Sequence, residues 1–320
     1  MKSRKLMCVT VLTLLAAPTA FASKTWFVNG VNGNDNNDCR SRQHACKTIS
    51  NAISLTLPGD SIIVAPATYH EGLVVPFNLN IIGSDAKTTI VDAGVVFGQA
   101  LVIGSEPKVP VTVSRMTFRG AAGLVDSGGG IYNCFGTLTV IDSIITGNRI
   151  RGGNGIFGYG GGIYNCPSST LTLINTTVSD NSAEIGGGIC NGGALTIINS
   201  TFSGNVARHR GGAIGNYGFL IITNSTFSGN SSGSSGLAGG ILNGGLFQAA
   251  GTLAINNSTL SGNTAGDGKG GGIFNVVGST VVLQNSIFAN NAGGNCHGSI
   301  ASVGYNLSSD HSCGLEAWAI

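Results

Sequence analysis

The chain has 320 residues, of which 52 are glycine, and only 9% of its residues are charged. Its formal net charge is +2 and its Lys and Arg residues are scattered, whereas nucleic-acid-binding proteins gather basic residues on one face. We therefore expect no nucleic-acid partner. The high glycine content and an unbroken internal repeat favour one elongated domain over two globular domains.

Residues 1–22 have the pattern of a secretory signal peptide. Lys2, Arg4 and Lys5 precede an apolar run at 6–17, and small residues follow it at a suitable cleavage point. The apolar run is shorter than the ~20 residues that a membrane-spanning helix needs, and no later stretch is long and apolar enough. We predict that the mature protein is secreted or exposed at the cell surface and has no transmembrane segment.

Residues 23–125 are predicted to form an N-terminal cap and irregular leading coils. Trp26–Val28 predicts a first short strand, and the loop at 29–38 that follows it is rich in side-chain oxygens. This composition makes calcium a candidate ligand, but the loop lacks the spaced acids and the closing Glu of an EF-hand. We interpret it as a loop closed by a disulfide between Cys39 and Cys46, and we expect no cofactor.

One short amphipathic helix is expected in this N-terminal region. Ile49, Ala52, Ile53 and Leu57 recur at helical spacing, and the pair at 58–59, Pro-Gly, ends the pattern. We expect the helix to cover the first coil, whose apolar interior and open strand edges would otherwise face water. Short β-runs separated by Gly, Pro and Asp are expected at 61–65, 73–75, 79–82, 89–91, 100–103 and 111–118.

Residues 126–295 consist of six copies of a two-part repeat. The first part is represented by Gly-Gly-Gly-Ile-Cys-Asn at 186–191 and the second by Asn-Ser-Thr-Phe-Ser-Gly-Asn at 199–205. Successive Ile residues of the first part are 32, 26, 25, 27 and 32 positions apart. A repeat of that length with short extended runs indicates a solenoid. We predict three short strands per coil, each paired in parallel with its copies ~4.8 Å above and below.

Two further columns follow from the alignment of the repeats. The interior is predicted to hold one apolar ladder made of Ile145, Val178, Phe202, Phe227, Leu260 and Phe288. The Asn columns of the repeats are expected to form left-handed turns and to pass amide hydrogen bonds from coil to coil, and one of these columns holds Asn175, Asn199, Asn224, Asn257 and Asn285. Asp142 occupies the same column, so we interpret it as a variant of this ladder.

Cysteines support an exported protein. Two disulfides are predicted where the ends of a solenoid have fewer neighbours, Cys39–Cys46 and Cys296–Cys313. Cys134 and Cys166 should lie on adjacent coils, and Cys190 sits one place out of their column; the pairing of these three is left open. No Cys-x-x-Cys or Cys/His cluster is present, so we expect no metal site. Residues 296–320 are predicted to be a C-terminal capping segment, and whether Ile320 is the natural end is left open.

Several motifs resemble known repeat families. Gly-Gly-Ala-Ile at 211–214 and Phe-Ser-Gly-Asn at 202–205 and 227–230 resemble the paired repeats of polymorphic outer-membrane proteins. The segments at 46–49 and 59–64 are similar to the opening of right-handed parallel β-helix proteins of the pectin-lyase-like superfamily, and the segment at 304–313 resembles the closing segment of secreted β-helix proteins. The resemblance implies an all-β, right-handed parallel β-helix with a short N-terminal capping helix.

Two surface columns are candidates for ligand contact. The first is an aromatic row that can bind sugar ring faces or can simply stabilise a sheet, namely Tyr132, Tyr164 and Phe274. The second is a charged column that can contact a ligand or form an exposed ladder of ion pairs, namely Arg151, Glu184 and Arg208 with His209 and Arg210 beside them.

Acidic residues are few in the repeats. They are Asp126, Asp142, Asp180, Glu184 and Asp267. Uronic-acid lyases and hydrolases on this fold need a calcium cluster with a basic residue, or two or three positioned Asp. We therefore predict no catalytic residues and expect a secreted adhesin-like module that binds a glycan or a cell-surface ligand. The alternative is a polysaccharide lyase or glycoside hydrolase that acts on an acidic polysaccharide.

Overall fold

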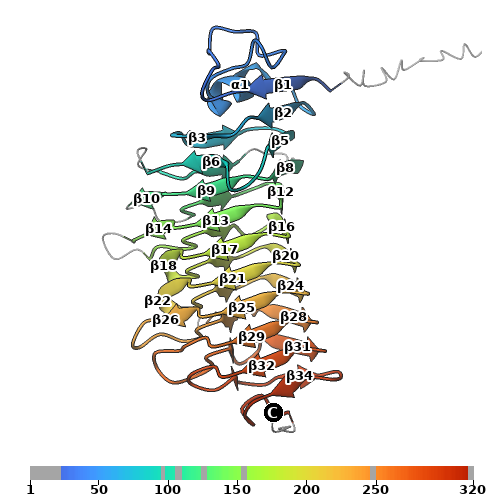
Figure 1. The fold of residues 1–320 in the computed structure, drawn as a ribbon. Helices are drawn as coiled ribbons and strands as arrows, with labels where there is room; N and C mark the ends of the chain where they lie inside the picture. Colours follow the sequence, from blue (N-terminus) through green and yellow to red (C-terminus); the bar gives the residue numbers. More distant parts are fainter. Residues whose placement is uncertain are drawn as a thin grey trace, which may run out of the picture.

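The computed structural model describes residues 23–94, 98–104, 110–123, 128–152, 157–245 and 250–315. Within these ranges the chain winds into a tall stack of coils whose strands form parallel sheets along its length (Figure 1). The predicted signal peptide at 1–22, Asp126 and Ile320 lie outside the described residues, so the predictions made for them stay predictions.

Four parallel sheets run along the stack. Sheet A has the order β1 (Thr25–Val28), β2 (Ser61–Val64), β5 (Leu79–Gly83), β8 (Pro110–Ser114), β12 (Thr137–Ile141), β16 (Thr170–Ile174), β20 (Ala194–Ile198), β24 (Phe219–Thr223), β28 (Thr252–Asn256), β31 (Thr280–Gln284) and β34 (Ala301–Ser302). Sheet B has the order β3 (Ala67–Tyr69), β6 (Thr89–Asp92), β9 (Thr117–Arg119), β13 (Ile144–Thr146), β17 (Thr177–Ser179), β21 (Thr201–Ser203), β25 (Thr226–Ser228), β29 (Thr259–Ser261), β32 (Ile287–Ala289) and β35 (Leu307–Ser308).

The other two sheets complete each coil. Sheet C has the order β4 (Leu73–Val75), β7 (Leu101–Ile103), β11 (Ile131–Asn133), β15 (Ile163–Asn165), β19 (Ile189–Asn191), β23 (Ile214–Asn216), β27 (Ile241–Asn243), β30 (Ile273–Asn275) and β33 (Cys296–His297). Sheet D has the order β10 (Ala122–Gly123), β14 (Arg149–Ile150), β18 (Ser182–Ile185), β22 (Val206–Arg210) and β26 (Ser231–Ser232).

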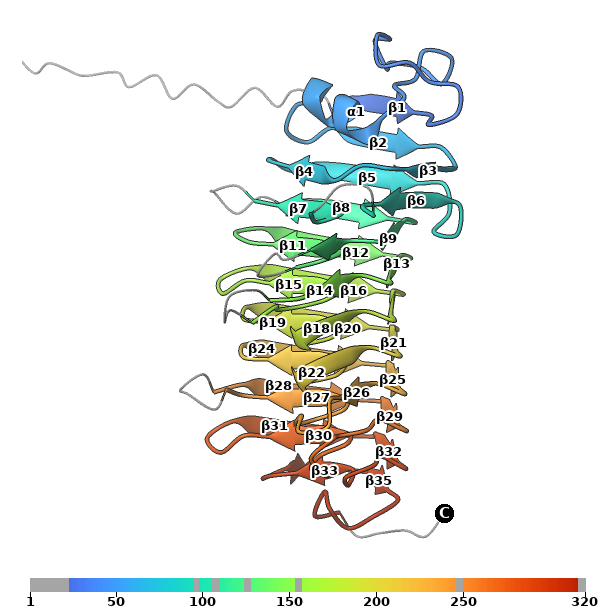
Figure 2. The same ribbon diagram turned by 90° about the vertical axis from the view of Figure 1, so that its left-hand side faces the viewer.

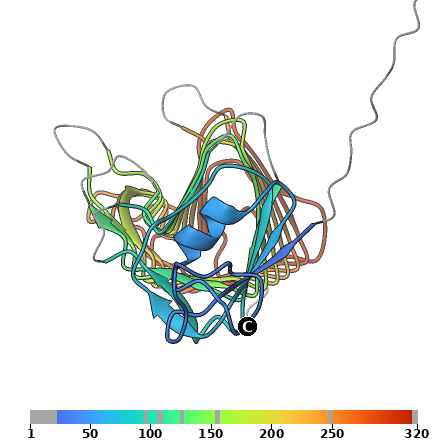
Figure 3. The same ribbon diagram turned by 90° about the horizontal axis from the view of Figure 1, so that it is seen from above.

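Sheet D corrects the prediction of three strands per coil. A coil of the central stack has four strands, because the chain extends again after each Gly-Asn turn before it returns to sheet C. Seen from above, sheet D lies at the left, beside the coil that sheets A, B and C enclose (Figure 3). The sequence of sheet D varies from repeat to repeat, so the alignment of the repeats did not reveal it.

The helix α1 (Ile49–Leu55) covers the N-terminal end of the stack (Figures 2 and 3). Its N-cap is Thr48, whose side chain accepts a hydrogen bond from the Asn51 backbone N–H, and Ile49 is among its buried residues. The capping role is therefore confirmed. The prediction that Leu57 belongs to the apolar face of this helix is wrong, because the helix ends at Leu55 and Leu57 is 51% exposed.

The predicted apolar ladder is confirmed. The six ladder residues are fully buried, and the register of sheet B places each one beside its copy in the next coil. The rings of Phe202 and Phe227 stack with centroids 4.5 Å apart and an interplanar angle of 9°. A single coil could not bury these side chains, so the stack itself supplies the core.

The Asn prediction is confirmed for the left-handed turns and for amide hydrogen bonds between coils, although different columns carry most of each. In the column of Asp142, Asn175 Nδ2 donates to Asp142 Oδ1 at 3.0 Å. Asp142 and the five Asn of its column have positive φ near 50°, but they lie at exposed turns. The continuous amide ladders use two other Asn columns, which are buried. In one of them Asn181 Nδ2 donates to Asn205 Oδ1 at 3.0 Å and Asn205 Nδ2 donates to Asn230 Oδ1 at 2.9 Å. These buried amides satisfy backbone groups inside the turns.

Both predicted disulfides are present, and a third joins Cys134 to Cys166 on adjacent coils. Cys190 is buried and free, and it pairs in register with Tyr164. Among the described residues, no helix is long and apolar enough to cross a membrane.

Candidate functional site

Sheet D carries the charged column that the sequence analysis singled out. Its strands alternate, so that Ile150, Ala183 and Ala207 are buried while Arg149 and Arg151 are exposed on the other side. The register of the sheet pairs Arg149 of β14 with Ser182 of β18 and Ser182 with Val206 of β22, so that outward residues of these strands lie in rows along the stack.

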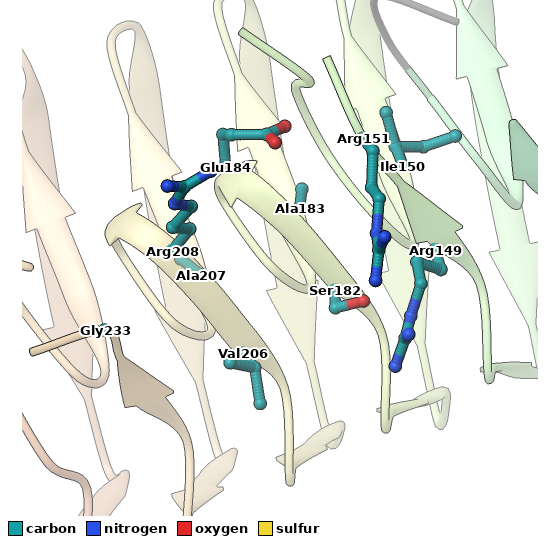
Figure 4. Close-up of a pocket in the computed structure, with 10 residues that line it drawn as sticks. All are labelled: Arg149, Ile150, Arg151, Ser182, Ala183, Glu184, Val206, Ala207, Arg208 and Gly233. Carbon is teal, nitrogen blue, oxygen red and sulfur yellow. The ribbon is translucent and has the colours of Figure 1, made fainter. Parts of the chain in front are cut away.

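These rows line a groove of about 480 Å³, which we call the basic groove (Figure 4). Arg149, Arg151 and Arg208 supply its positive charge, and Glu184 and Ser182 lie between them. Arg149 was not predicted, because the repeat alignment pointed to the position two residues later. The groove is open to solvent, since all three arginines are exposed.

Glu184 is held by the backbone and not by the arginines. Its Oε2 atom accepts hydrogen bonds from the backbone N–H of Gly152 at 2.9 Å and of Gly158 at 2.8 Å. The ion pair found among the described residues joins Arg119 to Asp92, elsewhere in the stack. The charged column therefore forms no ladder of ion pairs among the described residues, and that alternative is wrong.

A second concavity of about 520 Å³, the aromatic cleft, lies between the ends of the sheet D strands and the outer side of sheet C. Rings and one guanidinium group dominate its lining, which includes Phe157, Tyr159, Tyr164, Tyr217, Cys190 and Arg210. β22 belongs to both concavities, because Arg208 lines the basic groove and Arg210 lines the aromatic cleft.

The tyrosines of the cleft have raised pKa values. Burial, and then the neighbouring Cys190 and tyrosines, raise the pKa of Tyr164 to about 12. Burial likewise raises the pKa of Tyr159 and of Tyr217, where the Arg210 guanidinium counters part of the rise. Burial also raises the pKa of the Cys190 thiol. At neutral pH these groups are uncharged, so the cleft offers ring faces and hydroxyl donors and does not offer a ready base.

The predicted aromatic row is only partly brought together. Tyr132 and Tyr164 pack with ring centroids 5.9 Å apart, and Tyr159 adds a third ring 6.1 Å from Tyr164. Phe274 lies in the same column but four coils further along, where it stacks on His297 at 4.5 Å. Phe274 is therefore separate from the cleft.

His209 and Arg210 point to different neighbours. The His209 ring meets Phe157 edge to face at 5.4 Å, while Arg210 lies in the cleft beside Tyr217. Phe157, Tyr159 and Tyr217 were missed by the sequence analysis. Tyr217 had a signal, because it follows a repeat Asn in the same way as Cys134 and Cys166 do.

Neither concavity holds a pair of carboxylates. Among the residues that line them, Glu184 is the acid, while Asp142 and Asp180 sit at left-handed turns with φ of 50° and 55°. In the described ranges, no three Asp, Glu, His or Cys side chains gather in a way that could hold a metal ion. In the calcium candidate loop, Asp35 instead accepts backbone hydrogen bonds from Lys47 and Thr48.

Comparisons with known proteins identify the fold. No family model matches the chain, and no curated protein matches it. Among solved structures, pectin methylesterase PemA from Erwinia chrysanthemi is similar over 88% of this chain and 94% of its own, with 12% identity and a TM-score of 0.50. Pectate lyase Pel9A is similar over 90% of this chain and 80% of its own, with 16% identity and a TM-score of 0.50.

A pectin methylesterase in complex with hexasaccharide VII is also similar, over 88% of this chain and 94% of its own, with 13% identity and a TM-score of 0.50. The chain therefore has the right-handed parallel β-helix fold that these structures share, as its motifs implied. Identities this low establish the fold alone, so activity has to be argued from the site.

Proposed function

We propose that this protein is exported and binds a polysaccharide in the aromatic cleft. The observation that carries the proposal is the cleft itself, a concavity of about 520 Å³ lined by Phe157, Tyr159, Tyr164 and Tyr217 with Arg210 among them. Ring faces pack against the apolar faces of sugars, and a few polar groups fix their orientation. Three disulfides support export, because such bonds persist in oxidising compartments.

A second candidate function is enzymatic modification of the same polysaccharide. The solved structures named above include pectin methylesterases and a pectate lyase, which fit this alternative better than a purely adhesive role. Against it stands the chemistry of the cleft, where the tyrosines hold their protons tightly and no carboxylate lies among the lining residues. Binding is the function that the geometry supports better.

The test is an array of neutral and acidic polysaccharides probed with the chain from Ser23 onward. We expect binding that Tyr164→Ala and Tyr217→Ala each weaken by about tenfold, because a ring contact contributes about 1 kcal/mol beyond its buried area. Phe274→Ala is the matched control, since Phe274 lies in the column of Tyr164 but outside the cleft, and it should leave affinity unchanged.

Product analysis on each bound polysaccharide separates the two candidates. New reducing ends, unsaturated ends or released methanol would establish the enzymatic alternative. Binding without any product would support the binding module. An array without a single bound polysaccharide, or equal losses in the cleft variants and the control, would overturn the proposal.

A further inference from the structure

The three arginines of the basic groove lack an anionic partner. Arg149, Arg151 and Arg208 are exposed, and no hydrogen bond or ion pair joins their side chains to another described residue. Figure 4 shows the side chains of Arg149 and Arg151 running in the same direction, with Ser182 beside them. Positive groups held close together repel each other, so binding of an anion between them is electrostatically favourable.

The acid in the groove does not neutralise this charge. Glu184 already uses Oε2 to accept two backbone hydrogen bonds, and no ion pair joins its carboxylate to an arginine among the described residues. With one carboxylate against three guanidinium groups, the groove keeps a net positive charge. Ala183, Ala207 and Gly233 also line the groove.

The donor geometry favours a tetrahedral anion. A guanidinium group presents paired N–H donors in a plane, and Arg149, Arg151 and the Ser182 hydroxyl together offer donors from several directions. A sulfate or phosphate ester presents three free oxygens in different directions, whereas a carboxylate presents two in one plane. The groove is also larger than a single ion, with a volume of about 480 Å³, so the anionic group should be carried by a larger molecule.

The basic groove and the aromatic cleft are connected by the same strands. Arg208 in the groove and Arg210 in the cleft lie on β22, and Glu184 and Ile185 make the same connection on β18. A polymer whose sugar ring lies in the cleft can therefore place a substituent in the groove.

We propose that the basic groove binds sulfate or phosphate ester groups carried by the polysaccharide in the cleft. The inference rests on the proposed function, because the polysaccharide carries the ester.

The experiment compares length-matched dextran, dextran sulfate, phosphorylated dextran and polygalacturonate. Dextran sulfate or phosphorylated dextran should bind at least tenfold more tightly than polygalacturonate of equal charge. Arg149→Ala and Arg151→Ala should remove that preference, and Arg151→Lys should keep only part of it, since it retains the charge but loses the forked donor geometry. Whichever ester binds more tightly identifies the source of the tetrahedral group.

Arg42→Ala is the charge-matched control, because Arg42 is exposed in the N-terminal loop and lies outside the groove. Equal binding of the esters and polygalacturonate, equal losses in Arg42→Ala, or equally tight binding of duplex DNA would each overturn the inference. If the inference fails but polysaccharide binding still depends on Tyr164 and Tyr217, the proposed function stands. If the wild-type protein binds no polysaccharide at all, both the inference and the proposed function are overturned.

Discussion

Tyr164 shows how a residue gains its role from neighbours on adjacent coils and on the segment that leads into its own strand. Its ring contacts Tyr132 on one adjacent coil and Tyr159 from the segment that returns from sheet D, and Cys190 follows on the next coil. The sequence predicted the contact with Tyr132 from the alignment of the repeats. It did not predict Tyr159, because the returning segments differ in length from one coil to the next.

The pKa of Tyr164 gives a prediction for alkaline conditions. Its folded-state pKa is raised to about 12, while an unfolded tyrosine ionises near ~10. The folded state therefore holds the proton more tightly, and its contribution to stability is complete below pH ~10 and is lost as pH rises toward 12. We expect the free energy of unfolding to fall over this window and to fall less in Tyr164→Phe.

Denaturant unfolding at a series of pH values between 9 and 12 checks this prediction, with the range set by the tyrosine values above. Tyr305→Phe is the control, because Tyr305 is 92% exposed and should leave the curve as in the wild type. An unchanged slope in Tyr164→Phe would contradict the assigned burial.

At the scale of elements, each sheet B strand is fixed by its central side chain and by the polar residues at its ends. Phe202 and Phe227 stack in the interior, and the buried Ser200 and Asn205 that flank β21 bond to the next coil. The sequence predicted the apolar ladder correctly because its period is the period of the repeat. It predicted amide hydrogen bonds for the Asn columns in general, but it did not tell which columns form continuous ladders, since the columns have the same spacing and burial separates them.

Removing one ring from the apolar ladder should open a cavity. Phe227 is fully buried between Phe202 and Leu260, so Phe227→Ala should lower the free energy of unfolding by about 3 to 5 kcal/mol. Thr226→Ala on the exposed side of the same strand should change it by less than about 0.5 kcal/mol. Equal stabilities of the two variants in denaturant unfolding would show that the ladder does not form the core.

At the scale of the whole molecule, stability should be distributed along the stack. Each coil contacts mainly its neighbours, so the stability of a repeat protein is approximately a sum of contributions from single coils and from the contacts between adjacent coils. α1 covers one end, whereas the other end is held by the disulfide between Cys296 and Cys313. The sequence placed both devices correctly because they lie outside the repeats.

Loss of the C-terminal disulfide should therefore act locally. In a Cys296→Ser, Cys313→Ser double variant we expect faster amide hydrogen exchange in β33 and β35, while β21 and β25 keep the protection of the wild type. A matched variant, Cys190→Ser, controls for loss of a thiol that forms no disulfide. A uniform increase in exchange along the stack would show that the protein unfolds as one cooperative unit.

The sequence by itself determined the architecture, because a repeat of fixed pattern places equivalent residues one above another and its glycines, buried Ile and Phe define the coil. Only the tertiary structure decided the candidate site. Tyr159 and Arg149 lie in segments that differ between repeats; Tyr159 meets Tyr164 of sheet C, and Arg149 pairs with Ser182 of sheet D on the next coil. Repeat periodicity predicts what is shared by all coils, whereas a binding cleft depends on where the coils differ.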